Sequence, residues 1–191
     1  SAPPPAQPVA GASGFVYADV PNRAIAYIID AIILFVINII IGLVIGSFLP
    51  TTSINPNPTG FNDLVTVNYV GVLVSAVVST LISGAYFIYT WTAMRGSVGQ
   101  KLLGMQVGNF PDGATLKQDQ AIRRWIFLGA PLGLLSALTA AVGPALGAVI
   151  GLLGLAYFIY LLVTTAQSPT KQGFHDKQAN TVVVKAARSV G

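Results

Sequence analysis

The stretch AIAYIIDAIILFVINIIIGLVIGSFL, residues 24–49, decides the fold class, because its 26 residues include a single charged side chain, that of Asp30. A helix of about 20 apolar residues crosses the ~30 Å hydrocarbon core of a bilayer. Of the 191 residues in the chain, 53% are hydrophobic and only 8% are charged, whereas about a quarter are charged in a soluble domain. The sequence therefore predicts a membrane protein.

Two further apolar tracts follow, Tyr69–Ala93 with 25 residues and Trp125–Ala166 with 42. The last tract is too long for one crossing, and it breaks at Val142-Gly143-Pro144, where proline removes a helical hydrogen-bond donor. The predicted fold is an all-α bundle of four transmembrane helices. Its spans are expected at about 24–49, 69–93, 124–141 and 145–166.

Basic residues fix the expected orientation. All ten Lys and Arg residues lie outside the loop 50–68 and the turn 142–144. Cytoplasmic segments carry the excess of Lys and Arg, so both termini are predicted to be cytoplasmic. A basic face of this kind favours contact with anionic lipid head groups. It lacks the interleaved basic and aromatic residues of a nucleic-acid surface, so no nucleic-acid partner is expected.

The parts of the chain outside the spans have different expected structures. Residues 1–14, SAPPPAQPVAGASG, form an uncharged tail that should be disordered, and 186–191 form a second tail. Between them, 15–185 form the membrane domain. Its cytoplasmic element should contain a strand over Leu102–Val107 that pairs with Thr181–Val184, and an amphipathic helix that a capping box of Thr115 and Gln118 begins.

An acidic side chain inside the first span is the main candidate for a functional site. Arg23 and Asp30 are seven residues apart, which places them on one helix face about 10 Å apart. Tyr27 lies between them and Asn38 lies two turns deeper. Because a mid-helix Asp costs about 2.5–3.5 kcal/mol, it needs a partner or a function. Asp30 is thus either clamped by Arg23 and neighbouring hydroxyls or carries an ion, and the lack of other ionisable groups in the outer halves favours the clamp.

The pair His175-Asp176 in the last cytoplasmic segment is a second candidate. A metal-dependent phosphohydrolase dyad would need further His residues, and the sequence contains none. We therefore expect the pair to fix this segment against the membrane interface. Asp176 could share the positive charge of Arg23 or of Arg95 beside Asp30, which makes an intramembrane charge cluster of Arg23, Asp30 and Asp176.

Small residues recur every fourth position in the spans, and they predict close helix packing. The second span has Gly71, Ser75, Ser79 and Ser83, and the fourth has Gly147 and Gly151. These stripes hold the four helices of one chain together, or leave a face for another subunit, or line a polar path. We favour internal packing for most of them, and a partner surface for what remains.

The reactive residues of the sequence do not form a catalytic set. There is no Cys and no Glu, and His175 is the one His. No nucleophile with a base, no metal-binding set and no cofactor loop can be assembled from what remains. The segment GSVGQK does not match a phosphate-binding loop, because it lacks the four-residue gap that comes before Gly-Lys in such a loop and the Ser or Thr that follows. We expect no enzyme activity, no metal and no cofactor.

Three ordered blocks of the sequence resemble the RDD family of bacterial membrane proteins. They are RAIAYIID (23–30), GSVGQKLLGMQVGNFPDG (96–113) and QGFHDKQANTVVV (172–184). The family is named for one Arg and two Asp, which correspond here to Arg23, Asp30 and Asp176. Gln100 departs from the pattern, in which Gly commonly precedes the Lys. The resemblance, from Phe15 to Lys185, implies a multi-pass protein of the bacterial plasma membrane, and transport of unknown ligands has been suggested for the family.

These observations support two functions. The first is a non-catalytic accessory or structural subunit that docks into a larger membrane complex through small-residue faces, or forms a homo-oligomer. The alternative is an oligomeric transporter of a small ligand, a cation or a proton that uses Asp30.

Overall fold

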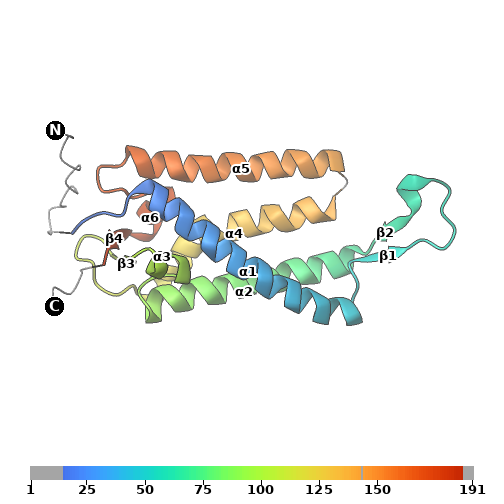
Figure 1. Ribbon diagram of the computed structural model, residues 1–191, viewed down its shortest axis with the longest axis horizontal. Helices are drawn as coiled ribbons and strands as arrows, with labels where there is room; N and C mark the ends of the chain where they lie inside the picture. Colours follow the sequence, from blue (N-terminus) through green and yellow to red (C-terminus); the bar gives the residue numbers. More distant parts are fainter. Residues whose placement is uncertain (1–14, 143, 187–191) are drawn as a thin grey trace, which may run out of the picture.

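The computed structural model describes residues 15–142 and 144–186, and these form a mostly helical bundle with two small sheets (Figure 1). The predicted tail 1–14 and most of the predicted tail 186–191 lie outside the described residues. Four helices are long and apolar enough to cross a membrane, as predicted. They are α1 (Val20–Phe48), α2 (Tyr69–Ala93), α4 (Gln118–Ala141) and α5 (Pro144–Gln167).

Two two-stranded antiparallel sheets lie at opposite ends of the bundle (Figure 1). At one end β1 (Thr52–Ile54) pairs with β2 (Val65–Val67), and a 3₁₀ turn (Phe61–Asp63) lies between them. We call this end the hairpin end. At the other end β3 (Met105–Asn109) pairs with β4 (Thr181–Lys185), with Val107 opposite Val183.

The short helices α3 (Val98–Leu102) and α6 (Phe174–Ala179) join β3 and β4 at this second end. We call α3, β3, α6 and β4 together the platform. α1 and α4 begin at the platform, and α2 and α5 end there (Figure 1). All nine Lys and Arg residues within the described ranges lie at or beside the platform, in the helix ends and connections that meet it.

Two predicted boundaries differ from the structure. The strand predicted over Leu102–Val107 begins at Met105, because Leu102 ends α3 and Gly104 makes the turn with a φ of 66°. The predicted capping box of Thr115 and Gln118 is wrong. The helix begins at Gln118, and the side chain of Gln120 accepts a hydrogen bond of 3.1 Å from the Lys117 N–H. The predicted amphipathic helix is therefore the first part of α4 and not a separate element.

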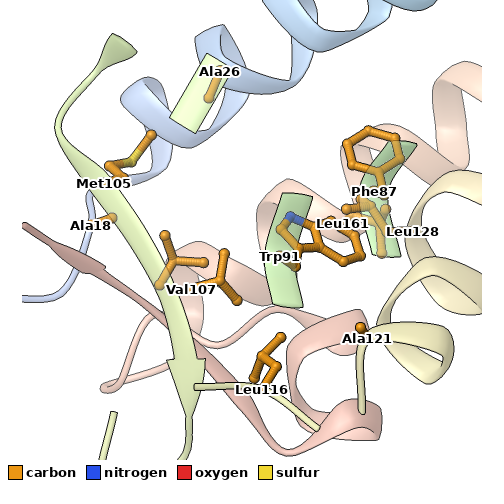
Figure 2. Close-up of a cluster of buried hydrophobic side chains, with 11 residues drawn as sticks. Ala18, Ala26, Phe87, Trp91, Met105, Val107, Leu116, Ala121, Leu128 and Leu161 are labelled. Carbon is orange, nitrogen blue, oxygen red and sulfur yellow. The ribbon is translucent and has the colours of Figure 1, made fainter. Parts of the chain in front are cut away.

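The buried hydrophobic core lies where the platform meets the spans (Figure 2). Phe87 and Trp91 of α2 pack there with ring centroids 4.9 Å apart. Met105 and Val107 bring the sheet into the same cluster, and Leu161 brings α5. The spans themselves bury little beyond this cluster, which is expected for helices whose apolar side chains face lipid. The core therefore fixes the platform onto the helix ends and positions the charged residues described next.

Candidate functional site

Asp30 lies on α1 and is buried, with 2% of its surface exposed. Three donors bind its carboxylate. The Tyr86 hydroxyl and the Gly99 N–H donate to Oδ1 over 2.7 and 2.8 Å, and the Ser97 hydroxyl donates to Oδ2. All three groups come from α2 or from the start of α3. A carboxylate with three donors needs no cation beside it to be accommodated in the bilayer.

The sequence around α3 explains why these donors reach Asp30. Ser97 caps α3, and the Gln100 side chain accepts from the Ser97 N–H over 2.9 Å. Gln100 also accepts from the indole N–H of Trp91 over 3.2 Å, which ties α3 to α2. A Cβ at Gly99 would stand 2.1 Å from the Ala26 carbonyl oxygen. Only glycine at this position lets α3 lie directly against the backbone of α1.

Asp176 on α6 is the second buried carboxylate, with 0% exposed. Arg23 of α1 binds its Oδ2 and Arg124 of α4 binds its Oδ1. The Thr181 hydroxyl and the Gly173 N–H add hydrogen bonds of 3.2 and 3.0 Å to the two oxygens. Asp176 thereby joins the starts of two membrane helices to the platform.

The two arginines are held by further contacts. Arg124 is 1% exposed, donates to the Thr181 hydroxyl over 2.7 Å, and lies 4.9 Å from the centroid of the Trp91 ring. A guanidinium over an aromatic face gains a cation–π attraction when it is removed from water. Arg23 also donates to the carbonyl of Lys171 in the segment before α6.

His175 lies beside this pair with 5% of its surface exposed. Its Nε2 is 3.3 Å from both Arg23 Nη2 and Asp176 Oδ2. Burial, together with the charges of Arg124 and Arg23, outweighs the attraction of Asp176 and lowers the pKa of His175 to about 3. The imidazole is therefore neutral at pH 7. Burial would raise the pKa of Asp176, but Arg124, Arg23 and His175 hold it far below its usual range.

Arg23 and Asp30, which were predicted to pair, do not pair in the structure. Arg23 pairs with Asp176, 153 positions later, and Asp30 accepts hydrogen bonds from α2 and α3. The spacing along one helix could not reveal this, because the partners come from distant segments. The predicted sharing of Asp176 with Arg23 agrees with the structure, but the second arginine is Arg124 and not Arg95.

The other predicted supporting residues have separate roles. Arg95, with a φ of 58°, donates to the carbonyl of Gly113 in the connection between β3 and α4. The Tyr27 ring stacks on Phe87 with centroids 6.2 Å apart and does not bridge Arg23 and Asp30. Asn38 donates to the carbonyl of Leu34 on its own helix over 2.8 Å.

The predicted packing residues divide into four groups. Ser83 accepts from the Trp125 indole over 3.2 Å, and Gly147 lies close to the Thr139 carbonyl, so both join helices. Gly71 packs against the Pro50 carbonyl in a loop and not against a helix. A Cβ at Gly151 would meet nothing within 4 Å. Ser75 and Ser79 line clefts between helices.

A cavity of about 50 Å³ lies between the group of residues around Asp30 and the group around Asp176. Its polar lining has Asp30, Ser97 and Gln100 from one group, and Arg23, Arg124 and His175 from the other. At roughly 10–15 Å³ of such volume per water, it has room for about three to five water molecules. The Arg124 Nε has no hydrogen-bond partner among the described residues. The cavity can therefore connect the two groups through small polar molecules.

Sequence reasoning missed Arg124, Ser97, Gly99 and Tyr86 as members of this site. Arg124 lies at the start of a predicted span, and the sequence marks it only as one of the basic residues that predict the orientation in the membrane. The signal for Ser97 was available, because Ser followed three residues later by Gln is a capping pattern.

Comparison with known families gives one match. The model of the RDD family matches residues 17–180, a range that contains Arg23, Asp30, Arg124 and Asp176. No curated protein and no solved structure matches the chain. The match covers most of the chain, including all four apolar helices and both buried carboxylates. The chain is thus a multi-pass membrane protein that belongs to the RDD family.

Proposed function

We propose that this RDD protein is a non-catalytic subunit of the bacterial plasma membrane that docks another membrane protein through the outer half of α1. One observation carries the proposal. Gly42 and Gly46 form a small-xxx-small pair on α1, and a Cβ at either position would meet nothing within 4 Å. Such pairs let two helix backbones approach closely in lipid, and no other helix of the described chain uses this one.

The platform supports the same role. Asp30 and Asp176 are both bound within the chain, by α3 and by two arginines. Their contacts hold the platform to the helix ends and leave neither group as a reactive acid or base. A rigid platform with an unused helix face is suited to assembly and not to catalysis.

Cysteine cross-linking in membranes tests the docking proposal, because the chain has no native Cys. Leu43→Cys places a thiol beside Gly42 on the exposed part of α1, and cross-linked species are identified by mass analysis. We expect one heterologous partner. Gly42→Ile with Gly46→Ile should abolish the product, whereas Gly151→Ile, which also meets nothing within 4 Å, should leave it unchanged. A chain that cross-links to nothing, or only to itself, contradicts the proposed docking.

We also propose that the platform is cytoplasmic, since the basic residues gather there. Exposed Lys101, Lys117 and Arg123 would then face anionic head groups. A membrane-impermeant maleimide should label Asn57→Cys at the hairpin end in spheroplasts, and label Lys117→Cys only after lysis. The reverse pattern would invert the topology.

Transport by an oligomer is the second candidate, and the cavity of about 50 Å³ favours it. Asp30, Arg124 and His175 line one small cavity inside the bundle, which a small ion or a proton could occupy. Purified protein in liposomes would be tested for cation and proton flux. Asp30→Asn should stop the flux, and Asp119→Asn, an exposed change on α4, should not. Unchanged flux in Asp30→Asn removes Asp30 from any transport mechanism.

A further inference from the structure

A second, larger cavity lies toward the middle of the membrane-spanning helices. It is a cleft of about 370 Å³ between α1, α2 and α4. Tyr27 and Phe87 line both this cleft and the small charged cavity, and their stacked rings lie at the boundary. The cleft is therefore distinct from the site of the two carboxylates. Its volume is within the range of small-molecule pockets, about 300–1,000 Å³.

Polar groups from three helices converge on this cleft. They are Asn38 of α1, Ser79, Thr80 and Ser83 of α2, and Ser136 of α4. Thr80 donates to the Ala76 carbonyl of its own helix. The Ser79 and Ser136 hydroxyls make no hydrogen bond within the described ranges, and Asn38 uses its amide N–H but not its carbonyl oxygen. Unbonded polar groups cost free energy at membrane depth, so these groups call for an external partner.

The depth of the groups separates this cleft from an ordinary lipid groove. Ser79 and Ser83 are residues 11 and 15 of the 25 in α2, and Asn38 is residue 19 of the 29 in α1. At the middle of a bilayer, neighbouring lipids present acyl chains, which have no hydrogen-bonding atoms. Acyl chains alone cannot satisfy the polar lining.

The lining also defines the charge and shape of the occupant. Among the described residues, no Asp, Lys, Arg or His lines the cleft, so a charged ligand would meet no counter-charge from them. The rest of the wall is apolar, with Leu34, Phe35 and Leu132 among its members. Gly133 of α4 lines the cleft, and a Cβ there would meet nothing within 4 Å, so a larger side chain has room to enter. Gly133 and Ser136 are both exposed, which leaves the cleft accessible from the bilayer.

We propose that this cleft binds an uncharged amphipathic molecule dissolved in the membrane. Its hydroxyl or amide groups bond to Asn38, Ser79 and Ser136, and its apolar body lies against Leu34, Phe35 and Leu132. A neighbouring cleft of about 290 Å³ shares Ser79, Ser136 and Ala137 and continues to Thr51 and Thr52 at the hairpin end. A ligand longer than the first cleft has room in that direction. The proposal goes beyond the docking role and does not depend on it.

Photolabelling tests the proposal. The full chain in phosphatidylcholine nanodiscs is irradiated with a monoacylglycerol that carries a diazirine in its acyl chain, and labelled residues are mapped by mass spectrometry. We expect saturable labelling of the α1, α2 and α4 residues that line the cleft. The methyl ester of the same diazirine fatty acid, which has no hydroxyl, serves as the matched probe.

Two kinds of variant distinguish the outcomes. Gly133→Leu fills the cleft and should abolish labelling, whereas Gly151→Leu adds the same side chain at another open position and should not. Ser79→Ala and Ser136→Ala keep the volume, and each should weaken monoacylglycerol labelling about fivefold, the effect of one lost hydrogen bond, while the ester probe is unaffected. The proposal is overturned by equal labelling with both probes, by labelling that persists in Gly133→Leu, or by Ser→Ala variants that behave as wild type.

Discussion

The backbone N–H of Gly99 lies 2.8 Å from Oδ1 of Asp30, and the two residues are 69 positions apart in the chain. This contact fastens the short helix α3 to the first membrane span. This hydrogen bond depends on the absence of a side chain at Gly99, because the N–H reaches the carboxylate only when α3 touches the α1 backbone.

Replacing Gly99 with Ala should destabilise the fold. The new Cβ would stand 2.1 Å from the Ala26 carbonyl oxygen, so α3 must move away from α1 and its bond to Asp30 must lengthen. Overpacking of this kind costs about 1–3 kcal/mol. Thermal unfolding in mild detergent measures the loss. Gly42→Ala, where a Cβ meets nothing within 4 Å, should unfold at or above the wild-type temperature. Equal unfolding temperatures for the two variants would contradict this packing argument.

Removing the Asp176 charge should cost more than removing Arg124. Asp176→Asn leaves Arg23 and Arg124 buried beside each other without their shared anion, and an uncompensated buried charge costs about 3–5 kcal/mol. Adding Arg124→Gln removes one of the two cations, so the double variant should be more stable than Asp176→Asn alone. A double-mutant cycle in denaturant measures the coupling. Strict additivity, within about 0.5 kcal/mol, would mean that the two groups do not interact.

Acid should destabilise the protein through His175. The folded pKa of about 3 lies below the usual histidine pKa of 6.5, so the unfolded chain binds a proton that the folded chain does not. The stabilisation is present above about pH 6.5 and is lost as the pH falls toward 3, with a limiting slope of about 1.4 kcal/mol per pH unit. Below about pH 4 the lowered pKa of Asp176 adds a loss of the same sign.

His175→Gln isolates this effect, since glutamine is polar and does not titrate. The free energy of unfolding should then depend less on pH between 6.5 and 4, while the loss due to Asp176 remains below that range. The same slope in both proteins would show that His175 is not the titrating group.

The departure from the family pattern at position 100 has a measurable consequence. The Gln100 side chain accepts from the Ser97 N–H and from the Trp91 indole. Gln100→Gly, which restores the residue common in the family pattern, removes both bonds and leaves the buried indole N–H without its partner. We expect a loss of about 1–3 kcal/mol, seen as a lower unfolding temperature and a shift in tryptophan fluorescence. A neutral or stabilising effect would show that water or a backbone shift replaces the side chain.

The spans could be predicted from composition because a bilayer imposes a length and an apolarity that are local properties of the sequence. The charged site could not, because its geometry depends on pairings between segments that lie far apart. Arg23 is the nearest cation to Asp30 along the helix, yet three uncharged donors from α2 and the start of α3 form hydrogen bonds with the Asp30 carboxylate. Arg124 could not be identified as the ion-pair partner of Asp176 for the same reason, since nothing near it in sequence marks Asp176 as its partner. The capping pattern at Ser97 was the one local signal that could have brought α3 into the argument.

The order of synthesis gives the Arg23–Asp176 contact a further consequence. Arg23 emerges from the ribosome 153 residues before its carboxylate partner, a delay of roughly 8–30 s at ~5–20 residues per second. During that interval the first span must enter the bilayer with a guanidinium that has no anion, so it stays at the head groups until translation reaches the platform. Completion of the chain, and not insertion of its helices, is then the step that closes the fold.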